Sequence, residues 1–282
     1  MNSDIVMATE LTPITNPEVS PWTQTAHDVG GRAVLSVITP VHAPDRDHLT
    51  ATYDSLVSQE LPDGWDIEWM LQEDGTTGVV NDVFRGEHRV KPGMAPHSDT
   101  ATARNLALAR SSGRLIKTLD QDDVLPPGAL QRDIEAFIKY PGVQWTCALT
   151  HDLLPDGSTQ APDNHFPAGL VKQDAVFDAW RARDHRLAVH PASSCYRRQA
   201  AVAMGGWMAL RHAGDTGLLL TTSTLWPGFY IGDPGLLWRR TPTQTSSQPV
   251  HKDPEERRLR NSLIEERVRA LQDLRGAIRA DG

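Results

Sequence analysis

The stretch KTLDQDDVLPPG, from Lys117 to Gly128, decides the fold of this chain. A short run that favours an extended, buried strand, 115–119, leads into three carboxylates within four positions, Asp120, Asp122 and Asp123, before two prolines and a glycine end regular structure. Carboxylates this close repel one another, so a folded protein tolerates them in open solvent or around a cation. These three residues, called the acidic cluster below, therefore mark either a solvated turn or a cation site.

The segments before the acidic cluster alternate between strand and helix patterns. We expect strands at 33–39, 65–72, 88–91 and 115–119, and helices at 47–59 and 100–111. This alternation predicts an α/β fold with a mainly parallel central sheet and helices on both faces. Ligands of such sheets bind at the carboxyl ends of the strands, where Pro40, Asp74 and the acidic cluster all fall. Their convergence favours a binding site over a solvated turn.

The second half of the chain is less regular. We expect a helix at 130–138, strands at 143–150, 190–198, 229–231 and 236–240, a helix from Asp215 to Thr222, and a last amphipathic helix at 254–278. The irregular stretch 151–185 between them is typical of a substrate site. The apolar stripe of the last helix either packs on the domain or forms a homodimer contact.

Composition excludes several classes of protein. The 282 residues carry a formal net charge of −8, which argues against a nucleic-acid partner because a nucleic-acid groove needs a concentrated basic face. The two cysteines, Cys147 and Cys195, lie in no CxxC or Cys/His cluster, so neither a disulfide framework nor a zinc site around them is expected. No signal peptide and no run of eighteen apolar residues occurs. We expect a soluble, cytoplasmic protein without a transmembrane segment.

Six segments, in this order and at this spacing, resemble the family 2 nucleotide-sugar glycosyltransferases with the GT-A fold. They are VLSVITPVH (34–42), QEDG (72–75), ATARNLALARSSG (101–113), LDQDD (119–123), GGW with GD (205–207 and 214–215) and LLWRRTPTQTS (236–246). With this resemblance we divide the chain into an N-terminal arm, 1–31, a GT-A domain, 32–250, and a C-terminal helix, 251–282. Within the domain, 32–127 is the expected nucleotide-sugar-binding half and 128–250 the acceptor-binding half.

The resemblance implies transfer of a sugar from a nucleoside diphosphate sugar to a hydroxyl of a small-molecule or glycan acceptor, with inversion at the anomeric carbon. A UDP-sugar is the first candidate for the donor. The leaving diphosphate gains negative charge, which Mn²⁺ or Mg²⁺ stabilises, and both cations prefer oxygen ligands. Asp122 matches the metal ligand of the family's DXD pair, and Asp120 matches a contact to ribose or metal. Asp123 either lies behind the metal ligands and holds them in place or faces solvent.

The same resemblance assigns the nucleotide-sugar contacts. Thr39 and Pro40 match the backbone wall beside the base, and Asp74 matches the acid that contacts base or ribose. Arg104 matches a residue near base and phosphates, with a helix-surface salt bridge as the alternative. Gln121, inside the acidic stretch, is counted with these contacts.

Asp215 matches the family's catalytic base, although Gly214 stands where the family usually has Glu. A purely structural role for Asp215, as the N-cap of a helix, is the alternative. On the acceptor side we select His190, Trp207 and His212, because aromatic faces stack on sugar rings and histidines bond hydroxyls. Core packing is the alternative for the tryptophan.

The strand ending WRR commonly continues with a histidine in the family, but here Thr241 follows. Three alternatives stay open: Arg239 or Arg240 covers the diphosphate, His251 replaces the missing histidine as a metal ligand, or the metal has fewer protein ligands. The segment 241–247 is either a lid over the donor or a surface loop.

Two alternative functions remain open. The departures at Gly214 and Thr241 motivate a catalytically silent relative that binds nucleotide sugar or a partner. A sugar nucleotidyltransferase would carry a glycine-rich, basic loop after its first strand, and the segment Val41–Asp45 lacks one.

Overall fold

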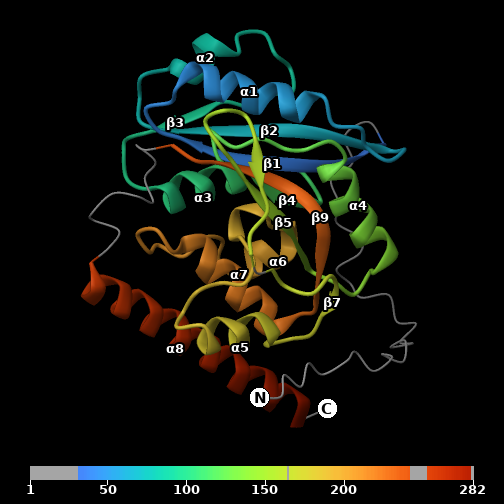
Figure 1. The fold of residues 1–282 in the computed structure, drawn as a ribbon, viewed down its shortest axis with the longest axis vertical. Helices are drawn as coiled ribbons and strands as arrows, with labels where there is room; N and C mark the ends of the chain where they lie inside the picture. The colour runs from blue at the N-terminus through green and yellow to red at the C-terminus, as the bar shows by residue number, and fades with distance from the viewer. Residues whose placement is uncertain (1–30, 164, 242–252, 281–282) are drawn as a thin grey trace.

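The computed structural model describes residues 31–163, 165–241 and 253–280, drawn in colour in Figure 1. One sheet runs through the molecule in the order β3-β2-β1-β4-β8-β5-β9-β7, with β6 paired to β5. Its strands are β1 Ala33–Val41, β2 Trp65–Asp74, β3 Gly93–Ala95, β4 Leu115–Thr118, β5 Trp145–Leu153, β6 Thr159–Gln160, β7 Gly169–Val171, β8 Cys195–Arg197 and β9 Gly228–Arg239. The helices are α1 Arg46–Val57, α2 Val79–Val83, α3 Thr100–Arg110, α4 Ala129–Lys139, α5 Ala175–Ala182, α6 Arg198–Ala203, α7 Gly214–Leu225 and α8 Pro254–Ala280.

The predicted fold class is confirmed. Strands β3, β2, β1 and β4 are parallel, β5 and β9 are parallel to each other, and β8 runs antiparallel between the two groups. Helices cover both faces of this sheet, and α8 forms the expected C-terminal helix (Figure 1). The division into a nucleotide half and an acceptor half stays a prediction, and most of the predicted arm, 1–30, lies outside the described residues.

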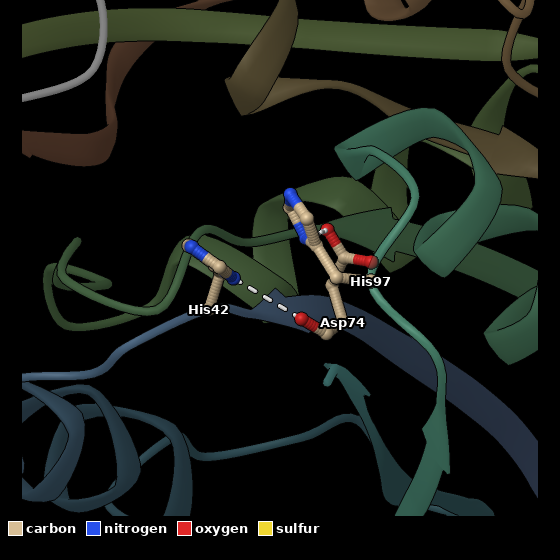
Figure 2. Close-up of side chains that lie close together, drawn as sticks. All are labelled: His42, Asp74 and His97. Carbon is tan, nitrogen blue, oxygen red and sulfur yellow. Dashed lines mark hydrogen bonds and ion pairs between the residues drawn. The ribbon is translucent and has the colours of Figure 1, made fainter. Parts of the chain in front are cut away.

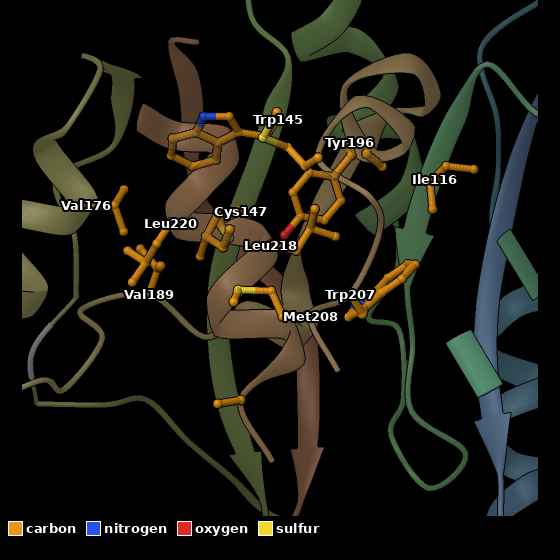
Figure 3. Close-up of a cluster of buried hydrophobic side chains, with 14 of the residues drawn as sticks. Ile116, Trp145, Cys147, Val176, Val189, Tyr196, Trp207, Met208, Leu218 and Leu220 are labelled. Carbon is orange, nitrogen blue, oxygen red and sulfur yellow. The ribbon is translucent and has the colours of Figure 1, made fainter. Parts of the chain in front are cut away.

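Apolar side chains fill both faces of the sheet. One cluster lies under α1 and α4, and the other joins α3 and β5 to α5, α6, α7 and α8. In the second cluster Trp145, Tyr196 and Leu218 are almost completely buried (Figure 3). Ile264 and Val268 of α8 are fully buried in it too, so α8 packs on the domain as one of the two expected alternatives.

Pro40 was expected to end the first strand but lies inside β1, where it pairs with Gln72 of β2. The Ile38 carbonyl accepts a hydrogen bond from Leu119 on the β4 side, and residues two apart in a strand face the same neighbour. The missing N–H of Pro40 therefore faces the side where β4 has already ended at Thr118. β1 therefore continues through the proline while paired with β2 alone.

Four predicted strands differ in extent from the observed ones, and one of them, at 88–91, is not a strand. The strand expected at 88–91 is an isolated bridge at Val90, and β3 follows at 93–95. Within the strand expected at 190–198, Cys195–Arg197 forms β8, but Pro191–Ser193 is a 3-10 turn. The Ser193 hydroxyl bonds the backbone N–H and carbonyl of Ala148 in place of a strand ladder. The two strands expected at 229–231 and 236–240 form the single strand β9, because register shifts against β5 absorb the glycines and proline between them. A helix, α5, also lies in the stretch expected to be irregular.

A buried ion pair joins the sheet to α4. Lys117 Nζ lies 2.7 Å from Asp133 Oδ2 and donates to the Ser193 carbonyl at 2.7 Å, while Thr146 donates to the other oxygen of Asp133 at 2.6 Å. The side chains of Lys117 and Asp133 are 0% and 1% exposed. The two charges therefore depend on these partners, since water cannot replace them.

Candidate active site

The acidic cluster follows β4 in a tight turn whose last member, Asp123, is buried. Its Oδ1 accepts the backbone N–H of Arg239 at 2.9 Å, and its carbonyl accepts the Thr52 hydroxyl at 2.8 Å. Its Oδ2 is buried and has no hydrogen-bond partner among the described residues. Burial, followed by repulsion from Asp120 and Asp122, raises the pKa of Asp123 well above its usual range. Asp123 therefore does not face solvent.

Asp122 is held through its main chain, which leaves its carboxylate available. Its carbonyl accepts Nε of Arg239 at 2.6 Å, so this guanidinium binds the backbone of the turn. Burial and the neighbouring Asp120 raise the pKa of the Asp122 carboxyl. Carboxylate oxygens are the ligands that Mn²⁺ and Mg²⁺ prefer. The donor set of the acidic cluster therefore fits Mn²⁺ or Mg²⁺.

Arg104 joins the acidic cluster to the second half of the chain. Its Nη2 lies 2.5 Å from Asp120 Oδ1, and the guanidinium is buried while the Asp120 side chain is 33% exposed, so this is not a helix-surface salt bridge. Burial lowers the pKa of Arg104, but the carboxylates of Asp120 and Asp215 more than offset this and raise it. Asp215, from the second half of the sequence, thus contributes to the same electrostatic environment.

Asp215 lies in the first turn of α7, one position past the first helical residue. The expected N-cap role was wrong: the cap position is Ala213, and Asp215 Oδ1 accepts the N–H of the adjacent Thr216 at 2.8 Å. The other carboxylate oxygen remains for a further partner. Gly214, which stands where the family has Glu, begins the helix in a space without room for a side chain, because a Cβ there would lie 2.7 Å from the Met208 carbonyl oxygen.

His190 lies near the same carboxylates. Burial lowers the pKa of His190, while Asp215, Asp120 and Asp152 raise it by a smaller amount. Its Nδ1 is buried without a hydrogen-bond partner among the described residues. Burial therefore disfavours the charged imidazolium at this position.

A stack of three side chains continues from His190 toward solvent. The rings of His190 and Trp238 have centroids 4.8 Å apart, and the guanidinium of Arg240 lies 4.2 Å from the Trp238 ring. Arg240 also pairs with Asp152 at 3.5 Å, with both side chains more than a third exposed. Arg240, unlike Arg239, therefore keeps an accessible cation at the end of β9.

The carboxyl ends of β1 and β2 form the expected nucleoside end of the site. The Thr39 hydroxyl accepts Nε1 of Trp69 at 2.8 Å, and the whole residue is buried, whereas Pro40 beside it is partly exposed. Asp74 is 6% exposed, and its Oδ1 accepts the Ser98 N–H at 2.7 Å. Both predicted carboxylate groups, Asp74 and the acidic cluster, are thus at one edge of the sheet.

Two histidines that the sequence analysis did not select lie against Asp74. His42 Nδ1 is 3.1 Å from the Asp74 carbonyl, and His97 Nδ1 is 2.9 Å from Asp74 Oδ2 (Figure 2). The two rings stack with centroids 4.5 Å apart. Gln121 holds the backbone of His42, accepting its N–H at 2.9 Å and donating to its carbonyl at 3.0 Å. The sequence pattern that could have identified them is a histidine directly after the first strand and a second histidine just before α3.

The remaining predicted site residues are Trp207, His212 and His251. Trp207 is 2% exposed and belongs to the core, although its ring lies 6.0 Å from the Arg104 guanidinium and Asn105 bonds both its N–H and its carbonyl at 2.9 Å. His212 is exposed in the loop before α7, with φ of 63°. His251 and the predicted lid from 242 onward lie outside the described residues. The roles assigned to all these residues remain predictions.

Comparison with known proteins agrees with this architecture. Residues 36–150 match the family model Glycosyl transferase family 2. The chain is 27% identical over 125 residues to chondroitin synthase of Pasteurella multocida (strain Pm70), and 27% identical over 154 residues to the putative teichuronic acid biosynthesis glycosyltransferase TuaG of Bacillus subtilis (strain 168). The structure of S. aureus TarS 1-349 in complex with UDP-GlcNAc superposes with a TM-score of 0.60 at 18% identity, covering 76% of this chain and 61% of that one.

The fold is that of the GT-A glycosyltransferases. The match to glycosyl transferase family 2 extends over residues 36–150, in agreement with the resemblance of the motifs to this family. The alignment with chondroitin synthase covers 43% of this chain and 13% of that protein, and the alignment with TuaG covers 51% and 58%. Among the described helices, none has the length and apolar character needed to cross a membrane.

Proposed function

We propose that this protein is a metal-dependent, inverting glycosyltransferase that moves a sugar from a UDP-sugar to an acceptor hydroxyl. The main support for this proposal is the buried guanidinium of Arg104. It forms an ion pair with Asp120 of the acidic cluster, and the carboxylate of Asp215 also raises its pKa. A donor site and a base are needed next to each other for direct transfer. UDP is the favoured nucleotide because the structurally similar TarS holds UDP-GlcNAc.

The donor would lie along the carboxyl ends of the strands. Asp74 and Pro40 would contact the nucleoside, with Thr39 buried behind them, while Asp120 and Gln121 would lie beside the ribose. Arg240, the exposed arginine at the end of β9, is the better candidate for the diphosphate, because Arg239 is engaged with the turn. Bidentate guanidinium contacts suit phosphate oxygens.

Asp122, with Asp120 beside it, would hold the Mn²⁺ or Mg²⁺ ion. When bound, the ion stabilises the negative charge that develops on the leaving diphosphate. His251, the further metal candidate, lies outside the described residues and keeps that role only as a prediction.

Asp215 would accept the proton of the acceptor hydroxyl as its oxygen attacks the anomeric carbon. The new glycosidic bond forms while the bond from the anomeric carbon to the diphosphate oxygen breaks, and a single displacement of this kind inverts the anomeric configuration. His190 and the ring of Trp238 would border the acceptor, which could be a small molecule or a glycan. Neutral His190 can donate one hydrogen bond from one ring nitrogen and accept one at the other.

Location and assembly are also proposals. The cytoplasm is the proposed compartment, where the free thiols of Cys147 and Cys195 stay reduced. A homodimer through α8 is supported by the apolar residues that its packing leaves exposed, Leu259, Leu263, Leu274 and Ile278.

Replacing Asp122 by Asn is expected to lower the transfer rate about 10²- to 10³-fold, because the leaving diphosphate loses an electrostatic partner of its cation. The same variant should lose the increase in melting temperature that Mn²⁺ gives the wild type. Asp273→Asn, which removes the same charge from an exposed position on α8, is the matched control. An unchanged Mn²⁺ shift in Asp122→Asn would remove this residue from the metal site.

Metal binding is expected to weaken at mildly acidic pH. Because burial and neighbouring acids raise the pKa of Asp122, its carboxyl takes up a proton at higher pH than an exposed aspartate does. Between the unfolded and folded pKa values the native state binds more protons, so the metal-free protein gains stability as pH falls through this window. The measurement is a series of thermal melts with and without Mn²⁺, from neutral to acidic pH. The increase in melting temperature that Mn²⁺ gives should become smaller as the pH falls, because the proton competes with the cation and also stabilises the metal-free protein. A shift that is constant with pH would contradict this.

A further inference from the structure

The side chains of His42, Asp74 and His97 form a compact group with the composition of a transition-metal site. One ligand atom from each residue lies within 4.8 Å of the others. Among the described residues, no second group of three histidine, cysteine or acidic side chains has this spacing. Two imidazole nitrogens and one carboxylate oxygen are ligands that Zn²⁺ takes, with a further position open to water. We propose that this group binds Zn²⁺, separately from the oxygen ligands of the acidic cluster.

The backbone already holds two of the three residues, His42 and Asp74, on rigid supports. His42 follows the last residue of β1, where Gln121 bonds both its N–H and its carbonyl, and Asp74 is the last residue of the neighbouring β2. Sites built on strand ends keep their geometry better than sites on free loops. Little of the main chain has to be ordered when the metal arrives.

The carboxylate is oriented so that one of its oxygens meets the imidazole of His97, which a cation between the two would bind in place of their direct contact. Asp74 Oδ1 accepts the Ser98 N–H at 2.7 Å, and Oδ2 points to His97 (Figure 2). Asp74 is 6% exposed, and its ion-pair partner among the described residues is the imidazole of His97. A buried carboxylate without a permanent cation gains more from a bound ion than an exposed one does.

The two rings can close on the ion without disturbing the core. The side chain of His97 is 63% exposed and His42 is exposed as well, while the rings already stack at 4.5 Å. Zinc–nitrogen bonds of about 2.0 Å place neighbouring ligand atoms roughly 3.3 Å apart in a tetrahedral site. The present spacing therefore needs only a modest rotation of exposed side chains.

Zinc at this place would compete with the nucleoside, a consequence that rests on the proposed function because it assigns Asp74 to the donor. Zinc binding itself does not depend on that assignment. The two can be separated by measuring binding of zinc alone, and then binding of uridine, which lacks the phosphates that would themselves bind zinc.

The test is a calorimetric titration of the full chain with Zn²⁺ in excess Mg²⁺, which keeps the oxygen site occupied. We expect one zinc per wild-type chain, with affinity at least about tenfold lower in His42→Ala and in His97→Ala, and lower still in the double variant. His88→Ala, which removes an exposed histidine outside the group, should bind as the wild type does. Histidine ring NMR signals of residues 42 and 97 should shift on zinc addition.

Equal zinc binding by the wild type and the double variant would overturn the proposal, as would the absence of saturable binding in the wild type. Metal-free melting curves verify that the variants fold. If zinc binds at these residues but does not weaken uridine binding, the competition and the placement of the nucleoside at Asp74 are wrong while the zinc site stands.

Discussion

Replacing Asp215 by Asn is expected to lower kcat about 10²- to 10⁴-fold, the contribution of a positioned general base. The amide of Asn keeps an oxygen that can accept the Thr216 N–H, so the first turn of α7 should remain intact. Because the amide cannot accept the acceptor's proton, attack on the anomeric carbon slows while the donor, which the other half of the site would hold, still binds. The measurements are steady-state kinetics with a UDP-sugar and calorimetric titration with UDP.

The same variant separates the enzyme from a catalytically silent relative. A binding protein would keep its full function after the Asp215→Asn substitution, whereas the enzyme would lose turnover and retain UDP affinity. Asp273→Asn on α8 controls for the loss of one negative charge. A variant with wild-type kcat would show that Asp215 is not the base, and a variant that loses UDP affinity would show that it belongs to the donor site instead.

The largest effect on stability is expected from the buried pair of Lys117 and Asp133. Asp133→Ala leaves an enclosed ammonium group with the Ser193 carbonyl as its remaining partner among the described residues, which should lower the free energy of unfolding by about 3–5 kcal/mol. Urea unfolding followed by circular dichroism measures this as a lower midpoint at unchanged slope. The exposed pair of Arg85 and Asp82 is the matched control, and Arg85→Ala should change nothing measurable.

A double variant, Lys117→Met with Asp133→Leu, tests the cause of that loss. If the penalty comes from an uncompensated charge, removing both charges should restore most of the stability that either single variant loses. A double variant as unstable as the sum of the two singles would instead point to lost packing volume.

The carboxylates of the site could be predicted because their signal is local. Asp74 and the acidic cluster directly follow buried strands, and parallel strands bring such ends together. The pair of His42 and His97 could not be found in this way. Those two residues are far apart in the sequence, and only the register of β1 with β2 and the path into α3 bring them to Asp74.

The strands that sequence patterns misplaced are those whose ends depend on distant contacts. Ser193 replaces a strand ladder with side-chain hydrogen bonds to Ala148, which no local pattern encodes. The position of Pro40 inside β1 depends on where β4 ends. The class of each long element could be predicted from periodicity, whereas these boundaries are decided by neighbours.

The hydrogen bonds of Arg239 to the acidic cluster also govern when the proposed donor site can form during folding. They join residues 116 and 117 positions apart, to Asp123 and Asp122. Contacts of such sequence separation form late, because a long loop must close before they contribute. A ribosome-bound chain that has emerged only as far as 150, the end of the family match, still lacks β9. The donor site is therefore completed by the last of the described strands to be synthesised, and a truncated chain should expose the edge of β5 as a template for aggregation.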